Sequence, residues 1–239
     1  MKRTQPNRMN CDGIARYYQV IEHLSFGRYL ERRRFALLGE ARTSRRAIVC
    51  GGGDGRFLAR LLRVNSHVEV DFVELSPKMI ELAERRVAGM GRTFRERVRF
   101  RVGDVWEFEP RTDGYDLIVT HFFLDCFSEP ELAGIVACLG SWGVPDARWI
   151  VSDFREAEGP VGRLWTRAVI RGLYAAFQCT TGLRVTRLPN YAAALVREGY
   201  LQRCEEKALG GLLKSSLWEA RPSRAGTCTE RWSSVSTHE

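Results

Sequence analysis

Long apolar runs are missing from this 239-residue sequence, and no stretch approaches the roughly twenty apolar residues that a membrane-spanning helix needs. The first residues, MKRTQPNRMNCDG, are charged and polar, and no apolar segment behind them could serve as a secretion signal. The sequence therefore predicts a protein without a transmembrane segment, and the cytoplasm is its expected location.

Paired cysteines are missing as well. The seven cysteines are scattered along the chain, their number is odd, and no two of them form a C-x-x-C pair. A disulfide framework or a zinc site would bring them together in the sequence. Free thiols, some of them in the core, are therefore expected, and no metal site is predicted.

Negative charge is the scarcer sign. There are 37 lysines and arginines against 29 acidic residues, which gives a net charge of +8 and a pI of about 9.4. A basic protein invites a nucleic-acid partner, but only ERRRF (31–35) and RTSRR (42–46) form local clusters. Dispersed arginine is typical of a solvated surface, so a small molecule is the preferred partner. The sequence makes no prediction about the oligomeric state.

Apolar periodicity divides the chain into a helical start and an alternating part. Residues 12–40 have the spacing of two amphipathic helices interrupted at Gly27. From Arg46 onward, short apolar strands alternate with helices, which is typical of a parallel sheet with right-handed crossovers. Strands are expected at 47–50, 68–74, 98–103, 115–120 and 148–153, with helices at about 55–63, 77–90 and 129–140.

The last third of the chain departs from this alternation. Residues 160–178 have the composition of a long, apolar-rich helix, and a shorter helix is expected at about 188–198. The following stretch reads as two strands joined at Gly210-Gly211, which is a hairpin signal. The parallel sheet is therefore expected to end in an antiparallel hairpin.

The stretch AIVCGGGDGRFLARLL, residues 47–62, combines a strand, a glycine-rich turn and a helix start. Such turns hold an anion or a nucleotide at the helix N-terminus. A nucleoside-triphosphate loop needs Lys-Ser or Lys-Thr after its last glycine, and a dinucleotide fingerprint needs a glycine where Arg56 stands. The pattern that fits is G-x-G-x-G, formed by Gly51, Gly53 and Gly55.

With this turn the sequence resembles the class I S-adenosylmethionine-dependent methyltransferases, the seven-stranded Rossmann-like group. The resemblance implies that the glycine loop passes under the methionine part of the cofactor, S-adenosyl-L-methionine. It also implies that Glu74, at the end of the second strand, accepts both ribose hydroxyls, since a carboxylate suits a vicinal diol. Asp104 and the backbone amide of Val105 would contact the adenine, and Thr120 would face the cofactor.

One position departs from the pattern of this family. Many members carry an acid two residues before the first glycine, where it assists the amino group of the methionine part. That position is Val49 here. Another group, a backbone carbonyl or Asp54, would have to replace the acid.

The resemblance also completes the expected architecture. It implies an α/β fold with a doubly wound, mostly parallel seven-stranded sheet that ends in an antiparallel hairpin, together with helical cap elements. The expected division is an N-terminal helical cap at 1–45 and a Rossmann-like methyltransferase domain at 46–220. That domain would contain a cap insertion at 160–183, and residues 221–239 would form a disordered tail.

The segment THFFLDCF follows the fourth strand, where ligands bind in doubly wound sheets. His121 is the candidate base, because its unperturbed pKa suits proton transfer near neutrality. Asp125 would orient His121 or position the substrate. A base is needed only if the acceptor must lose a proton. The expected acceptor-site residues are aromatic, and they are Tyr17, Tyr18, Phe122, Phe123, Trp165 and Tyr174.

The acceptor is expected to be a small organic molecule. Amino-methylating enzymes of nucleic acids in this family carry an Asn/Asp-Pro-Pro-aromatic motif after the fourth strand, and residues 120–123 do not match it. The apolar additions at both ends resemble the caps of small-molecule methyltransferases. Two alternatives stay open: an RNA or protein methyltransferase, and a non-catalytic member that binds the cofactor or serves as an interaction module.

Overall fold

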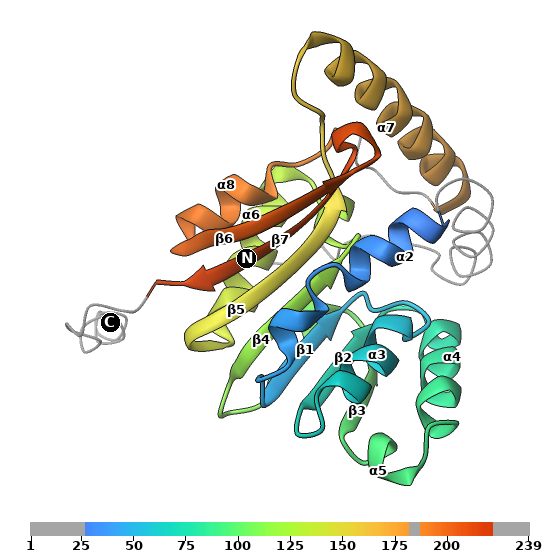
Figure 1. The fold of residues 1–239 in the computed structure, drawn as a ribbon, viewed down its shortest axis with the longest axis vertical. Helices are drawn as coiled ribbons and strands as arrows, with labels where there is room; N and C mark the ends of the chain where they lie inside the picture. Colours follow the sequence, from blue (N-terminus) through green and yellow to red (C-terminus); the bar gives the residue numbers. More distant parts are fainter. Residues whose placement is uncertain (1–26, 182–186, 222–239) are drawn as a thin grey trace, which may run out of the picture.

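A computed structural model describes residues 27–181 and 187–221 of the chain. These residues form a seven-stranded sheet with the strand order β3-β2-β1-β4-β5-β7-β6 (Figure 1). The sheet is parallel from β3 to β5, and β7 runs antiparallel to both β5 and β6. The expected mostly parallel sheet with a terminal antiparallel hairpin is therefore confirmed. In the described part of the chain, no helix is long and apolar enough to cross a membrane.

The strands follow the apolar runs of the sequence closely. The fifth strand begins at Gly143, earlier than the expected 148. The strands are β1 Arg46–Cys50, β2 Glu69–Glu74, β3 Val98–Val102, β4 Tyr115–His121, β5 Gly143–Phe154, β6 Tyr200–Ala208 and β7 Leu213–Ala220. Near-continuous apolar sequence is expected where a parallel sheet is covered on both faces.

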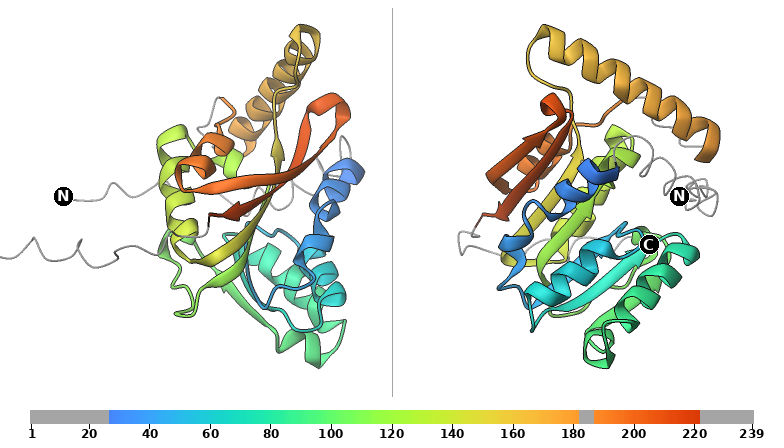
Figure 2. Two further views of the ribbon diagram at one scale, coloured as in Figure 1. Left: turned by 60° about the vertical axis from the view of Figure 1, so that its left-hand side comes forward. Right: turned by 45° about the vertical axis from the view of Figure 1, so that its right-hand side comes forward.

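Helices cover both faces of the sheet (Figure 2). The helices are α2 Gly27–Phe35, α3 Arg56–Val64, α4 Pro77–Ala88, α5 Arg92–Arg95, α6 Glu129–Ser141, α7 Pro160–Thr181 and α8 Tyr191–Arg197. Short 3-10 turns are η2 Leu38–Ala41, η3 Val105–Glu107, η4 Leu124–Cys126 and η5 Leu209–Gly211. The helix at 77–90 begins as expected, because the Ser76 hydroxyl accepts from the Met79 amide at 3.3 Å and Pro77 occupies the first turn.

Two apolar cores hold these layers together. One face packs α3 and α4 on the sheet through Phe57, Leu61, Ile80, Val49, Phe72 and Val119. The other face packs α6 and α8 on it through Ile135, Leu139, Leu195, Ile48, Ile118 and Trp149. The strand order reverses between β1 and β4, and this switch point is where open α/β sheets bind ligands beyond the carboxyl ends of their strands.

Helix α7 packs on the rest of the molecule through a narrow stripe. Thr166, Ile170 and Tyr174 are buried at four-residue intervals, and a third core joins Ile170 and Tyr174 to Leu30 of α2 and Phe154 of β5. Val169 and Leu173 are partly buried beside this stripe, whereas Val161, Leu164 and Trp165 are exposed. The helix therefore connects α2 to the carboxyl end of β5.

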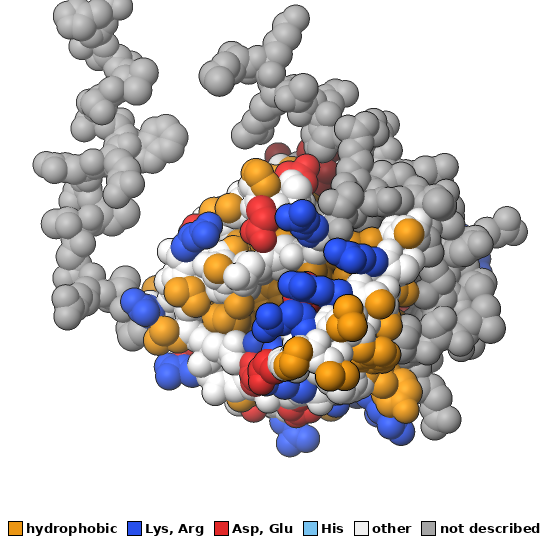
Figure 3. All heavy atoms as spheres, turned by 90° about the horizontal axis from the view of Figure 1, so that it is seen from above, with side chains coloured by type: hydrophobic (Ala, Val, Ile, Leu, Met, Phe, Trp, Pro, Cys, Tyr) orange, Lys and Arg blue, Asp and Glu red, His pale blue; other side chains and the backbone are white. Residues whose placement is uncertain are grey.

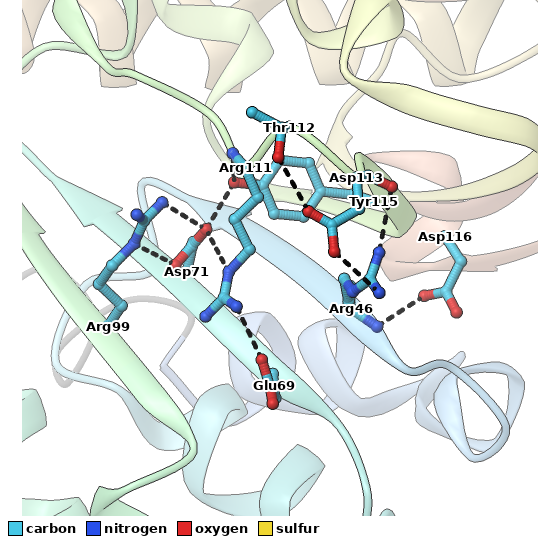
Figure 4. Close-up of polar contacts among 9 residues, drawn as sticks. All are labelled: Arg46, Glu69, Asp71, Arg99, Arg111, Thr112, Asp113, Tyr115 and Asp116. Carbon is cyan, nitrogen blue, oxygen red and sulfur yellow. Dashed lines mark hydrogen bonds and ion pairs between the residues drawn. The ribbon is translucent and has the colours of Figure 1, made fainter.

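A buried ion-pair cluster, which the sequence did not predict, lies on β2 (Figure 4). Asp71 is fully buried and accepts from Arg99 at 2.6 and 2.8 Å and from the Tyr115 hydroxyl at 2.5 Å. Arg111 also reaches Asp71, at 3.2 Å, and pairs with Glu69 at 2.7 Å. The pairing satisfies a carboxylate that would otherwise be costly to bury, so the cluster ties β3 and the loop after it to β2.

Candidate functional site

The site is built from the glycine-rich turn between β1 and α3. Gly51, Gly53 and Gly55 all have positive φ angles, of 64°, 59° and 77°, which side chains with a Cβ rarely adopt. A Cβ on Gly53 would meet no atom within 4 Å, whereas a Cβ on Gly55 would lie 2.7 Å from the Cβ of Ala83 on α4. The two glycines therefore serve different purposes: Gly53 faces open space, and Gly55 allows α3 to approach α4.

The carboxylate of Glu74 supports this turn from the end of β2. One oxygen accepts from the Gly53 amide at 3.0 Å, and the other accepts from the Ser76 amide at 3.1 Å. Burial raises the pKa of Glu74, while the backbone donors and the charge of Arg34 oppose that shift. The sequence assigned Glu74 to the ribose, and the structure brings it to the glycine turn.

Asp104 and Val105 follow β3 at the same edge of the sheet. Asp104 is half-buried, and one of its carboxylate oxygens accepts from the Trp106 amide at 3.1 Å, which starts η3. Val105 is buried in the core beneath this turn. The local turn fixes the direction in which the Asp104 carboxylate leaves the backbone.

Thr120 and His121 end β4 next to the glycine turn. The Thr120 hydroxyl is buried and accepts from the Trp149 indole at 2.9 Å, so its side chain is bonded within the core. Cys50 of β1 pairs with Thr120 of β4 in the parallel register. The next residues along the two chains, Gly51 and His121, therefore lie beside each other at the carboxyl edge of the sheet.

The imidazole of His121 is buried and has no hydrogen-bond partner for either ring nitrogen among the described residues. Its ring packs edge-on against Phe57, with centroids 4.6 Å apart. Burial, together with the charge of Arg34, lowers the pKa of His121 to about 3. The ring is therefore neutral at pH 7, and it is a weaker base than its sequence suggested.

Asp125 pairs with a second carboxyl that the sequence analysis did not single out. Asp125 lies in η4 and Asp153 near the end of β5; both are buried, and the Asp125 amide donates to the Asp153 carboxylate at 3.2 Å. Burial raises the pKa of Asp125 to about 6, and burial together with the negative charge of Asp125 raises the pKa of Asp153 well above its usual value. The Tyr174 hydroxyl of α7 donates to the Asp125 carbonyl oxygen at 3.2 Å.

Four of the six candidate acceptor-site aromatics lie among the described residues, and they occupy different positions. Phe122 contacts Phe154, with ring centroids 5.4 Å apart, and Phe123 lies against Gly51, where an added Cβ would come within 2.7 Å of its ring. Trp165 is half-exposed on α7 and is not in the buried stripe. Tyr17 and Tyr18 lie outside the described residues.

Arg34 of α2 is a site residue that the sequence analysis missed. It is buried, its guanidinium lies 5.5 Å from the centroid of the Phe122 ring, and its charge acts on both Glu74 and His121. Within ERRRF its neighbours Arg32 and Arg33 look the same in sequence. No local pattern distinguishes the one arginine of the three that turns inward.

The side of the molecule on which α7 lies, seen from above in Figure 3, carries both basic and apolar side chains. On α7 itself Arg163, Arg167 and Arg171 are exposed, and so are Val161 and Leu164.

The residues present fit S-adenosylmethionine. The open side of Gly53 provides room along the loop, the Glu74 carboxylate suits a ribose diol, and Asp104 stands at the next strand end. The two buried nitrogens of His121 have no hydrogen-bond partner within residues 27–181 and 187–221, so they could pair with a polar group of the ligand, since such atoms are rarely left without a partner.

Comparisons with known proteins agree with this geometry. Residues 48–144 match a family model described as a methyltransferase domain. The malonyl-[acyl-carrier protein] O-methyltransferase of Paenibacillus sp. (strain JDR-2) is 33% identical over 95 residues, which are 37% of this chain and 32% of that protein.

Solved methyltransferase structures share the fold. The apo S-adenosylmethionine-dependent methyltransferase SibL superposes with a TM-score of 0.61 at 19% identity, over 87% of this chain and 58% of SibL. The mitomycin 7-O-methyltransferase MmcR gives 0.59 at 19% identity, over 85% of this chain and 60% of MmcR. The chain thus spans about a third of the curated relative and less than two thirds of these two structures.

Proposed function

We propose that the chain is a class I S-adenosylmethionine-dependent methyltransferase and that it methylates a small, partly apolar organic acceptor; the domain match over residues 48–144 and the shared fold support this proposal. The observation that carries the proposal is the glycine turn with the Glu74 carboxylate hydrogen-bonded to it. Gly51, Gly53 and Gly55 would line the methionine part, Glu74 the ribose, and Asp104 with Val105 the adenine. Thr120 would contribute through its backbone, because its hydroxyl already accepts from Trp149.

S-adenosylmethionine supplies a methyl group already activated on a positively charged sulfur. The chain therefore has to align the acceptor and exclude water rather than activate the donor. The described aromatics best placed to align the acceptor are Phe122, Phe123 and Tyr174, because they lie where the glycine turn, the end of β4 and α7 come together. We retain Trp165 and the undescribed Tyr17 and Tyr18 as acceptor-site candidates.

If the acceptor must lose a proton, Asp125 is the better candidate base in this site. Its pKa of about 6 leaves it mostly ionised at neutral pH and still close enough to neutrality to take a proton. Asp153 would share that proton. His121, with a pKa of about 3, would contribute mainly as a neutral hydrogen-bonding group.

We also propose the domain division expected from the sequence, with caps at 1–45 and 160–183 around a domain at 46–220. Leu30 of α2 and Tyr174 of α7 lie in one apolar cluster, which supports the idea that the two caps meet. The relatives named as a malonyl-[acyl-carrier protein] O-methyltransferase and a mitomycin 7-O-methyltransferase support an acceptor other than nucleic acid.

A labelled-methyl assay tests the proposal. The purified chain is incubated with S-adenosylmethionine labelled in the methyl group and with separate small-molecule, RNA and protein fractions of a cell extract. We expect label in an organic-extractable small molecule, and none when Gly53→Val replaces the wild type. Label in RNA or protein would favour the alternative acceptors. S-adenosylhomocysteine binding without any transfer would favour the non-catalytic alternative.

A further inference from the structure

The amino-acid end of S-adenosylmethionine carries a carboxylate and an ammonium group, and both need partners in the site. The position at which many family members carry an acid is Val49, which is 1% exposed and packed in the core beneath the turn. Asp54, the nearest acid on the loop, is held by Arg56 at 3.0 Å and by Arg86 at 2.8 Å. Neither residue is placed to serve the ammonium.

Two other groups meet at this end of the loop. Arg34 is 7% exposed, and its guanidinium lies over the ring of Phe122, the residue directly after β4. His121 is 4% exposed and is the last residue of β4, the strand that pairs with β1. Its two ring nitrogens have no partner among the described residues. Phe123, two residues after His121, touches Gly51 and so places this segment against the first glycine of the loop.

We propose that Arg34 and His121 hold the amino-acid end of the cofactor, with the guanidinium donating to its carboxylate and an imidazole nitrogen accepting from its ammonium. This assignment rests on the proposed function. In this arrangement a neutral imidazole accepts from the ammonium group, in place of the acid that many members of the family carry.

The positive charge of Arg34 and the neutral state of His121 both suit this arrangement. A buried guanidinium is stabilised when a carboxylate comes within hydrogen-bonding distance, and its planar fork matches that group. His121 stays neutral because it is buried beside Arg34, and a neutral imidazole offers an acceptor lone pair.

Calorimetry with two ligands tests the assignment without requiring activity. S-adenosylhomocysteine carries the amino-acid end, and 5′-methylthioadenosine has the same nucleoside and sulfur without it. We expect Arg34→Met to weaken the binding of S-adenosylhomocysteine by about tenfold or more, which is the scale of lost charge-assisted hydrogen bonds. The binding of 5′-methylthioadenosine should weaken by less than about twofold. Arg32→Met, an exposed arginine of the same helix, should change neither affinity.

His121→Phe isolates the second contact, because a phenyl ring preserves the packing on Phe57 and removes both nitrogens. It should weaken S-adenosylhomocysteine by about threefold or more and leave 5′-methylthioadenosine within about twofold. Should Arg34→Met fail to fold, Arg34→Gln provides the same comparison with a polar side chain.

The outcomes separate the inference from the function on which it rests. Equal losses for both ligands, or an unchanged affinity for S-adenosylhomocysteine, would overturn the assignment and leave the proposed function standing. A wild-type protein that binds neither ligand would overturn both.

Discussion

Glu74 uses both of its carboxylate oxygens to hold two backbone segments: the turn after β1, through the Gly53 amide, and the start of α4, through the Ser76 amide. A carboxylate oxygen has lone pairs beyond those used by one backbone donor, so the same group can still accept from a ribose. The residue therefore has two functions: it shapes the glycine turn, and it presents acceptors to the ligand.

Glu74→Ala should weaken S-adenosylhomocysteine by about 1.5–3 kcal/mol, the scale of hydrogen bonds to a charged group. 5′-Methylthioadenosine should lose as much, because it carries the same ribose. A loss of affinity for both ligands distinguishes Glu74→Ala from Arg34→Met, which should affect S-adenosylhomocysteine alone. Calorimetry on a variant with an unchanged circular-dichroism spectrum measures it, with the exposed Glu81→Ala as the control. A change of less than about threefold would refute the ribose assignment.

The Asp125–Asp153 pair makes the stability of the protein depend on pH. A carboxyl whose pKa is raised on folding stabilises the native state fully below its unfolded pKa, and that stability is lost as the pH rises through the folded value. For Asp125 this window runs from about 4 to about 6 and corresponds to about 3 kcal/mol.

Urea denaturation between pH 4 and pH 7 measures this effect. The free energy of unfolding should fall with rising pH in the wild type. In Asp153→Asn the fall should be smaller, because one of the two carboxyls whose pKa is raised on folding is removed. Parallel pH profiles for the two proteins would show that the pair does not share a proton.

At the scale of structural elements, the glycine turn combines a packing requirement and a binding requirement in five residues. Gly53→Val places a branched side chain in the open space of the turn and should abolish S-adenosylhomocysteine binding while the circular-dichroism spectrum survives. Gly55→Ala places its methyl group against Ala83 and should instead lower the melting temperature. Wild-type binding by Gly53→Val would mean that the cofactor lies elsewhere.

The Asp71 cluster contributes to stability rather than to the reaction. Asp71→Asn leaves Arg99 and Arg111 facing a neutral group in a buried setting and should cost about 3 kcal/mol or more in the free energy of unfolding. Glu69→Gln removes the half-exposed partner of Arg111 and should cost less than about 1 kcal/mol. Urea denaturation measures the free energy of unfolding of both variants. Equal losses would contradict the view that the buried carboxylate of Asp71 matters more than the half-exposed carboxylate of Glu69.

Over the whole molecule, the fold was largely predictable because local patterns specify it. The strands are continuous apolar runs, Ser76-Pro77 marks a helix start, and Gly210-Gly211 marks the hairpin between β6 and β7. The start of β5 was expected at 148 rather than at Gly143, since Pro145 and Asp146 are atypical of a strand.

The site was predictable only where it follows a local motif. The glycine turn, Glu74 and Asp104 each stand at the end of a recognisable strand. Arg34 and Asp153 depend on contacts between segments far apart in the chain, α2 over β4 and η4 beside β5. No spacing in the sequence indicates which of three consecutive arginines is buried or which strand-end acid faces Asp125.

The central claim is that S-adenosylmethionine binds across the carboxyl ends of β1, β2 and β3. A crystal structure of the full chain with S-adenosylhomocysteine tests it most directly. The account predicts the ribose on Glu74, the adenine beside Asp104 and Val105, and the homocysteine part along Gly51–Gly55. A ligand bound elsewhere, or a complex in which Glu74 does not contact the ribose, would contradict it.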